Sequence, residues 1–106
     1  MRSTEATDLY QPMTENELKY AVLILAHRQG WAVFHLPANR MVRPVKDAIG
    51  YPDLTLARDR EVLWIELKAQ DGVLSMEQLA WFDALPACHV IRPSDWHSGR
   101  VAELLS

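Results

Sequence analysis

Residues 51–68 read YPDLTLARDREVLWIELK, and the centre of the fold follows from them. Two runs in this stretch, residues 54–58 and 62–68, alternate in polarity and carry strand-favouring side chains. Asp59-Arg60 separates the runs and predicts a two-residue hairpin turn, although Asp-Arg is a weaker turn signal than Asn-Gly. We therefore expect an antiparallel hairpin with its tip at these two residues.

The register of this hairpin brings two acidic residues together. With the turn centred on Asp59-Arg60, Asp53 lies directly opposite Glu66, and opposed residues have Cβ atoms roughly 4.5–5.5 Å apart. Lys68 is two residues beyond Glu66 and so lies on the same face. A register slip of one residue would separate the two acids. The other face is wholly apolar and consists of Leu54, Leu56, Leu63, Ile65 and Leu67.

Two carboxylates and a lysine in this arrangement suit the hydrolysis of a phosphodiester. We expect Asp53, Glu66 and the backbone carbonyl of Leu67 to coordinate Mg²⁺ or Mn²⁺, because both cations prefer oxygen ligands. Lys68 would stabilise the charge that develops on phosphorus or orient the attacking water. The alternative is a surface ion cluster in which Lys68 only neutralises two repelling acids.

A capping box predicts the first helix. Thr14 is the expected N-cap and Glu17 its partner three residues later, and Gly30 stands where a helix stop belongs. The cap occupies Glu17. Glu15 lies three residues before Leu18 and seven before Val22, so we expect it to point toward the sheet and to complete the site through a second metal or its water. The alternative is that Glu15 only favours the positive helix N-terminus. The residues expected to share the inward face are Leu18, Ala21, Val22, Leu25 and Gln29.

A second capping box begins at Ser75, with Gln78 as its third helical residue. Gln78 therefore has two roles open to it: it caps this helix, or it positions a phosphate or the attacking water. Pro86 ends the helix. The residues expected to face inward are Leu79, Phe82 and Leu85, with Trp81 close by.

Two short strands and a terminal helix complete the order. Residues 31–36 and 89–92 predict strands, and His35 on the first is either a DNA or metal-water contact or an edge histidine with satisfied hydrogen bonds. One terminal helix opens at Pro93, docked by Leu104 and Leu105. The fold class is therefore α/β in the order αβββαβα, with residues 1–12 as a flexible tail and residues 13–106 as a single domain.

The composition indicates a folded domain in a reducing compartment. At 106 residues and 49% hydrophobic content, the chain can bury a modest core. No apolar run approaches the ~20 residues of a membrane span, and residues 1–8 lack the hydrophobic segment of a signal peptide. We therefore expect a cytoplasmic protein without a membrane partner. The single Cys88 excludes an internal disulfide and is expected to be a buried small hydrophobe.

The net charge of −3 opposes nucleic-acid binding in bulk, but local charge matters more than the sum. Arg40, Arg43 and Lys46 lie in one loop with only Asp47 opposing them. A loop of this length is often functional, and we expect its basic residues to contact DNA. The alternative is a solvated, flexible loop.

In their order along the chain, these motifs resemble the VRR-NUC family of the PD-(D/E)xK nuclease superfamily, in particular its small stand-alone members from phages and prophages. The similarity covers about Thr14 to Trp96, most of the chain. It rests on Thr14-Glu15-Asn16-Glu17-Leu18, Gly30-Trp31 with Phe34-His35, Gly50-Tyr51-Pro52-Asp53-Leu54, Ile65-Glu66-Leu67-Lys68-Ala69, and residues 72–81 with Leu74-Ser75 and Gln78.

The resemblance implies a restriction-endonuclease-like αβββαβ core, Mg²⁺ or Mn²⁺ dependence and hydrolysis of DNA. It also places the family's helix glutamate at Glu15 and its motif glutamine at Gln78, and the stand-alone relatives are similar to homodimers that cleave Holliday junctions. We therefore expect a structure-selective, homodimeric endonuclease that acts on branched or duplex DNA. The alternative is a non-catalytic DNA-binding or protein-interaction module that keeps the nuclease fold.

Overall fold

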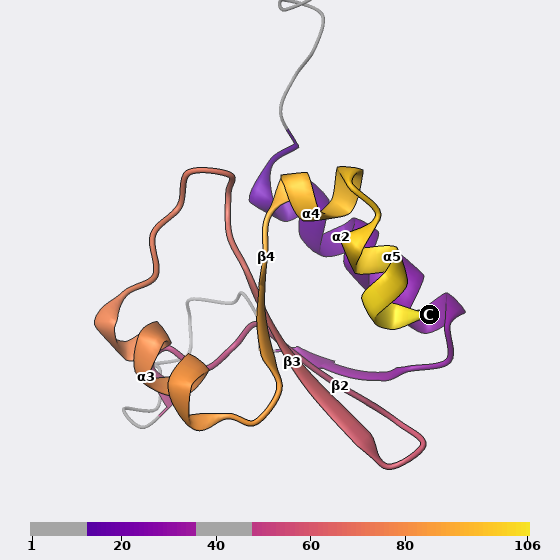
Figure 1. The fold of residues 1–106 in the computed structure, drawn as a ribbon, viewed down its shortest axis with the longest axis horizontal. Helices are drawn as coiled ribbons and strands as arrows, with labels where there is room; N and C mark the ends of the chain where they lie inside the picture. The colour runs from indigo at the N-terminus through magenta and orange to yellow at the C-terminus, as the bar shows by residue number, and fades with distance from the viewer. Residues whose placement is uncertain (1–12, 36–47) are drawn as a thin grey trace, which may run out of the picture.

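The protein has a mixed α/β fold, described here by a computed structural model for residues 13–35 and 48–106 (Figure 1). Four strands form one sheet in the order β1-β2-β3-β4, in which β1, β2 and β3 are antiparallel neighbours and β4 runs parallel to β3. The elements are α2 (Glu15–Arg28), β1 (Ala32–His35), β2 (Leu54–Arg58), β3 (Glu61–Leu67), α3 (Met76–Ala84), β4 (Cys88–Ile91), α4 (Pro93–His97) and α5 (Arg100–Leu105).

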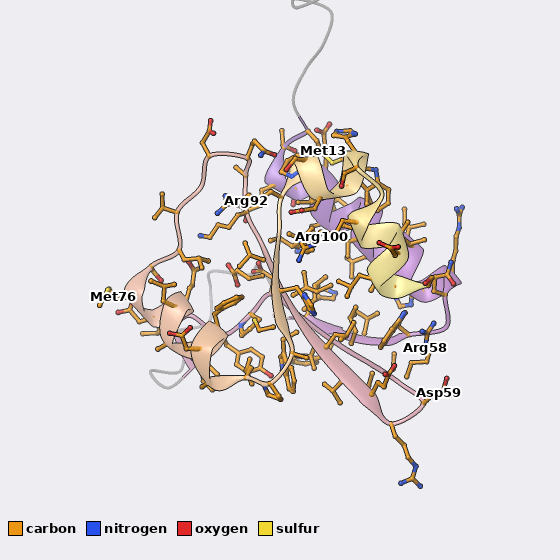
Figure 2. The ribbon with its side chains drawn as sticks, viewed as in Figure 1. Met13, Arg58, Asp59, Met76, Arg92 and Arg100 are labelled. Atoms are coloured by element: carbon orange, nitrogen blue, oxygen red, sulfur yellow. The ribbon has the colours of Figure 1, made fainter. Side chains whose placement is uncertain are left out.

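The central hairpin has the predicted register. Leu54 pairs with Ile65, and Arg58 pairs with Glu61. Both turn residues have positive φ, 50° at Asp59 and 70° at Arg60, as a type I′ turn requires. This turn follows the right-handed twist of the two strands, so the hairpin adopts it without the usual glycine (Figure 2).

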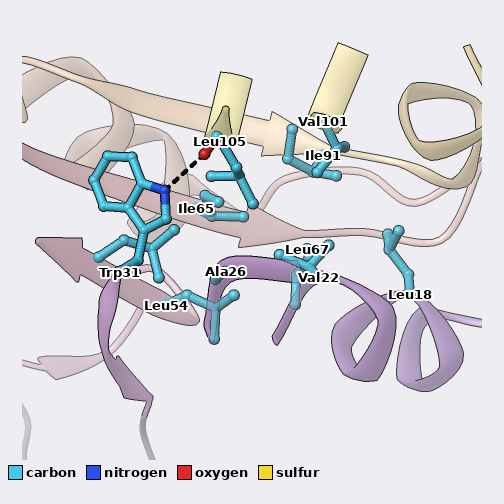
Figure 3. Packing of buried hydrophobic residues seen from close by; sticks show 11 residues of the cluster. Leu18, Val22, Ala26, Trp31, Leu54, Ile65, Leu67, Ile91, Val101 and Leu105 are labelled. Carbon is cyan, nitrogen blue, oxygen red and sulfur yellow. Dashed lines mark hydrogen bonds between the residues drawn. The ribbon is translucent and has the colours of Figure 1, made fainter. Parts of the chain in front are cut away.

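The hydrophobic core lies on one face of the sheet, beneath α2, α4 and α5 (Figures 1 and 3). Along α2 the fully buried residues recur every four positions, which is the spacing of one helix face. Each large apolar side chain that is fully buried contributes about 1.5–3 kcal/mol. The buried set is Leu18, Val22, Ala26, Trp31, Leu54, Leu56, Ile65, Leu67, Ile91, Val101 and Leu105.

The prediction that Gln29 shares the inward face of the first helix is wrong. Gln29 is exposed and serves as the C-cap, while Ala26 is fully buried in its place. Gln29 follows Arg28, the last helical residue, so the helical period no longer sets its direction. Gly30 has φ +85° and stops the helix as expected.

The C-terminal region forms two helices, where the sequence predicts one. Gly99 between them has φ +88°, which interrupts the helical path. Trp31 Nε1 donates to the carbonyl of Leu105 over 2.9 Å (Figure 3). Arg58 stacks 4.2 Å from the centre of the Trp31 ring and donates to the carbonyls of Gln29 and Ser106. These contacts fasten α5 to β2 and to the end of α2.

The helix α3 lies apart from the core, beside β4 on the other side of the sheet (Figure 1). It contributes no buried residue, and Leu79, expected to face inward, is 41% exposed. The prediction fails because α3 packs on the sheet through Trp81 and not through Leu79. The rings of Trp81 and Tyr51 form an edge-to-face pair with their centres 4.9 Å apart. Met76 points outward and is 80% exposed (Figure 2).

Within residues 13–35 and 48–106, every helix is too short or too polar to cross a membrane.

Candidate functional site

Asp53 and Glu66 meet at the open end of the hairpin, on the face opposite the core. Alternation along β3 puts Glu66 on the side away from Ile65 and Leu67. Asp53 directly precedes β2, and its Oδ2 accepts a hydrogen bond from the backbone N–H of Leu67 over 2.8 Å. Because Leu54 pairs with Ile65, the preceding Asp53 lies opposite Glu66 at this end of the hairpin. The structure thus brings together the two acids that the sequence pairs.

The carbonyl of Leu67 lies on the same edge of the strand. In extended chain the N–H and the C=O of one residue point to the same side, and the N–H of Leu67 points to Asp53. The carbonyl oxygen of Leu67 is therefore on the side of the acid pair, where the sequence predicts a third oxygen ligand.

The acid pair is strongly desolvated. Glu66 is 5% exposed, and among residues 13–35 and 48–106 it is the one charged residue that is buried. Burial, and after it the charge of Asp53, raises the pKa of Glu66 to about 8, while Lys68 acts in the opposite direction. Burial also raises the pKa of Asp53, against the opposing effects of the Leu67 N–H and of Lys68. At neutral pH the pair consequently favours a bound proton or a bound cation.

Gln78 caps α3 as the sequence predicts, and the other end of its amide contacts Glu66. Its Oε1 accepts from the backbone N–H of Ser75 over 2.8 Å, and its backbone N–H donates to the Ser75 hydroxyl over 3.1 Å. Its Nε2 donates to Oε2 of Glu66 over 2.8 Å. The cap fixes which end of the amide faces Ser75, so the amide nitrogen is directed at Glu66.

Lys68 comes two residues after Glu66, directly after the end of β3. Its charge lowers the pKa of both Asp53 and Glu66. Its backbone N–H donates to the carbonyl of Ile91 over 3.0 Å. Lys68 therefore leaves the sheet from a fixed backbone position.

Two charged residues near the start of α2 influence the acids electrostatically. Glu17 caps the helix as expected, accepting from the N–H of Thr14 over 2.9 Å. Glu15 is exposed, and its charge contributes to the raised pKa of Glu66. Lys19 lowers the pKa of Asp53 and was not among the predicted site residues. Its spacing of four from Glu15, which puts both on one helix face, could have identified it.

An aromatic and hydroxyl cluster next to the acids was also not predicted. Trp64 Nε1 donates to the Tyr51 hydroxyl over 2.8 Å, and that hydroxyl lies 3.3 Å from the Thr55 hydroxyl. Trp64 and Thr55 are paired across the hairpin on the face of Glu66. Because Tyr51 also meets Trp81, the cluster joins α3 to the sheet.

His35, one of the predicted DNA-contacting residues, is not brought to the acid pair. His35 pairs with Leu54, so it lies at the sheet edge on the face opposite Glu66. Arg40, Arg43 and Lys46 lie outside the described residues.

The donor set fits a hard divalent cation, since two desolvated carboxyl groups and a backbone oxygen share one edge. Among residues 13–35 and 48–106, no group of three or more His, Cys, Asp or Glu side chains is placed to hold a metal ion, so protein ligands would be few and water would complete the shell. Comparison with family models, with curated proteins and with solved structures finds no match to this chain.

Proposed function

We propose that this protein is a Mg²⁺- or Mn²⁺-dependent deoxyribonuclease with a restriction-endonuclease-like core, related to the VRR-NUC family. The single observation that carries the proposal is the juxtaposition of Asp53 and buried Glu66 at the open end of the hairpin, with Lys68 two residues beyond Glu66. Two like charges in contact destabilise a fold unless something compensates them. A divalent cation compensates both at once.

The order of elements and the mixed sheet support the same proposal. The described chain follows α, three antiparallel strands, α and a parallel strand, which is the αβββαβ order expected of such a core. The acids sit at the end of the hairpin where its two strands leave the sheet.

The residues divide the work as follows. Asp53, Glu66 and the Leu67 carbonyl would hold the cation, which polarises the scissile phosphate and activates water when bound. Lys68 offsets the negative charge that develops on phosphorus. Gln78 donates to Glu66 and so fixes the orientation of that carboxylate. Glu15, at the rim, orients water or a second cation.

A cleavage assay tests the proposal. Labelled four-way junction, flap, duplex and single strand are incubated with purified protein and Mg²⁺, Mn²⁺ or EDTA. We expect cleavage in either metal and none in EDTA. Asp53→Asn should cleave roughly a hundredfold more slowly, because about 1.4 kcal/mol of lost transition-state stabilisation corresponds to a factor of ten.

Glu61→Gln is the matched control, since Glu61 lies exposed at the far end of the same hairpin. It should cleave at the wild-type rate. A folded Asp53→Asn protein that cleaves as fast as wild type, or cleavage that persists in EDTA, would refute the proposal.

For the substrate we propose branched DNA and for the active species a homodimer, because two strands cut symmetrically call for two sites related by a twofold axis. Light scattering at micromolar concentration distinguishes a dimer from a 12.1 kDa monomer. Monomers alone would exclude symmetric junction cleavage while leaving nicking intact.

A second candidate function is a protein-interaction module, favoured by the large exposed side chains at the start of α3. Val73 is 82% and Met76 is 80% exposed, and exposed apolar groups of this size often mark a partner surface. If this function is correct, a pull-down should retain protein partners after nuclease treatment, and the purified protein should cleave none of the DNA substrates.

A further inference from the structure

The backbone alone does not fix the side chain of Lys68. Lys68 comes directly after Leu67, where β3 ends, and its last sheet bond is the one to the carbonyl of Ile91. A lysine side chain has four rotatable bonds and loses about 1.5–2 kcal/mol of conformational freedom when it is ordered. Something beyond the strand must therefore hold the ammonium near the acids.

The turn that follows Lys68 folds back against its side chain. The N–H of Gly72 donates to the carbonyl of Ala69 over 3.0 Å, which closes the turn at residues 69–72. A Cβ built on Gly72 would lie 3.2 Å from Cδ of Lys68, nearer than most real Cβ contacts. The turn thus packs on the aliphatic stem of Lys68, and Gly72 leaves the room for it.

The carbonyl groups of this turn converge on one cation, Arg92. Its Nη1 lies 3.0 Å from the carbonyl of Ala69, 3.2 Å from that of Gln70 and 2.6 Å from that of Gly72. Hydrogen bonds from a charged donor are roughly twice as strong as neutral ones. Three carbonyls aimed at one nitrogen define the shape of the turn.

Arg92 is itself anchored at the end of β4. It is the N-cap residue of α4, and its backbone N–H donates to Asp95 over 2.7 Å. A second tie joins the same turn to α4: Gln70 and Ser94 exchange hydrogen bonds of 3.1 and 2.9 Å. The turn after Lys68 is therefore fastened to the rigid junction between β4 and α4.

We propose that Arg92 is a positioning residue, which holds the turn 69–72 against Lys68 and so fixes the Lys68 ammonium beside Asp53 and Glu66. In its catalytic part this inference rests on the proposed nuclease function. Arg92 acts on the reaction only through Lys68, because its side chain is committed to the carbonyls of the turn.

Lysine-specific NMR tests the positioning without any need for activity. The sequence holds three lysines, at 19, 46 and 68, so ¹³Cε-labelled lysine gives few signals to assign. We expect an ordered Lys68 side chain in wild type and, in Arg92→Gln, an order parameter below about 0.6, the range of flexible groups. The Lys19 signal serves as the internal reference and should not change.

Arg100→Gln is the matched control. Like Arg92, Arg100 donates to a backbone carbonyl, in its case that of Val90 over 3.3 Å. It also forms an ion pair with Asp95 over 3.0 Å, and these contacts do not involve the turn 69–72. It should leave Lys68 ordered. A folded Arg92→Gln protein whose Lys68 side chain is as ordered as in wild type would overturn the inference.

Gly72→Ala gives the same test if Arg92→Gln does not fold. The added methyl meets the Lys68 stem while the arginine and its charge remain. It should change the Lys68 signal and leave that of Lys19 in place. An unchanged Lys68 signal in this variant would likewise overturn the inference.

Kinetics test the catalytic part. Arg92→Gln should lower kcat roughly tenfold or more with KM unchanged within about twofold, since Lys68 acts on charge that forms only in the transition state. Arg92→Lys should recover part of kcat, and Arg92→Gln should add no further loss to Lys68→Met. Independent, additive losses would refute action through Lys68. If wild type cleaves no DNA, the nuclease proposal fails, while the NMR result still decides the positioning.

Discussion

At the scale of single residues, Gln78 connects the folding of a helix to the chemistry of the site. The same amide caps α3 through Ser75 and donates to Glu66. A capping box satisfies two backbone donors locally, so its residues are specified by folding alone. Here the free end of the capping side chain reaches a buried carboxyl group, and one residue type meets both requirements.

Gln78→Glu separates the two roles. A glutamate at this position still accepts from the Ser75 N–H, so α3 keeps its cap, but it loses the donor to Glu66 and adds a third negative charge. A hydrogen bond to a charged group contributes about 1.5–3 kcal/mol, so kcat/KM should fall roughly ten- to a hundredfold. Steady-state cleavage kinetics measure the loss.

Ser75→Ala is the counterpart. It should lower stability by about 1 kcal/mol through the lost cap, and it leaves the amide of Gln78 in place, so cleavage should change less. Wild-type kinetics in Gln78→Glu would show that the bond to Glu66 has no part in the reaction.

Residues whose partners are close in sequence were the predictable ones. Both capping boxes and the stop at Gly30 follow from neighbours three or four positions away. Trp31 and Arg58 were missed because their partners, Leu105 and Ser106, lie at the other end of the chain. Arg92 was missed for the same reason, because the carbonyls that it bonds lie in the turn 69–72, twenty or more residues earlier in the sequence.

At the scale of elements, α3 depends on one close approach of backbone to backbone. A Cβ on Gly50 would lie 2.5 Å from the carbonyl carbon of Glu77, so the residue before Tyr51 must be glycine for the helix to pack there. Gly50 also has φ +84°. Gln78 follows Glu77 directly, so the close contact between Gly50 and Glu77 also sets the position of Gln78.

Gly50→Ala and Gly99→Ala form a matched pair for this contact. Both glycines have nearly the same φ, +84° and +88°, but a Cβ on Gly99 meets nothing within 4 Å. Gly99→Ala should destabilise by about 1–2 kcal/mol through backbone strain alone. Gly50→Ala should lose about 1–3 kcal/mol more through the clash, and cleavage should fall as well. Urea unfolding midpoints of the two variants measure the difference, and equal losses would contradict it.

The hairpin was predictable and α3's surroundings were not, for a physical reason. Period-two alternation and a two-residue turn fix the strand register and hence the opposition of Asp53 and Glu66. Helical periodicity predicts an inward face only where a helix lies across a sheet. Since α3 packs through Tyr51 and Trp81, its apolar Leu79 faces solvent.

At the scale of the whole molecule, the acid pair makes stability depend on pH. The folded pKa of Glu66, about 8, lies above the ordinary glutamate value of 4.5, and the pKa of Asp53 is raised as well. The protonated pair therefore contributes stability that is fully present below the unfolded values and is lost as pH rises through about 8. Without metal, the free energy of unfolding should fall by up to about 1.4 kcal/mol per pH unit for each proton involved.

Thermal or urea unfolding between pH 5 and 9 in EDTA measures this slope. Glu66→Gln should flatten it, because the amide has no proton to lose in this pH range. Saturating Mg²⁺ or Mn²⁺ should flatten it too, and at a hundredfold excess over Kd the cation should add about 2.7 kcal/mol. A slope that is unchanged in Glu66→Gln would show that the pair is not the origin.

The core occupies one side of the sheet, while α3 on the other side buries no residue. Mutational drift on the two sides therefore has different consequences. Changes beneath α2 and α5 threaten folding. Residues 73–85 can vary more freely so long as Gly50, Ser75, Gln78 and Trp81 keep their contacts. In this architecture, selection can retune what the site encounters while the scaffold that presents Asp53 and Glu66 stays the same.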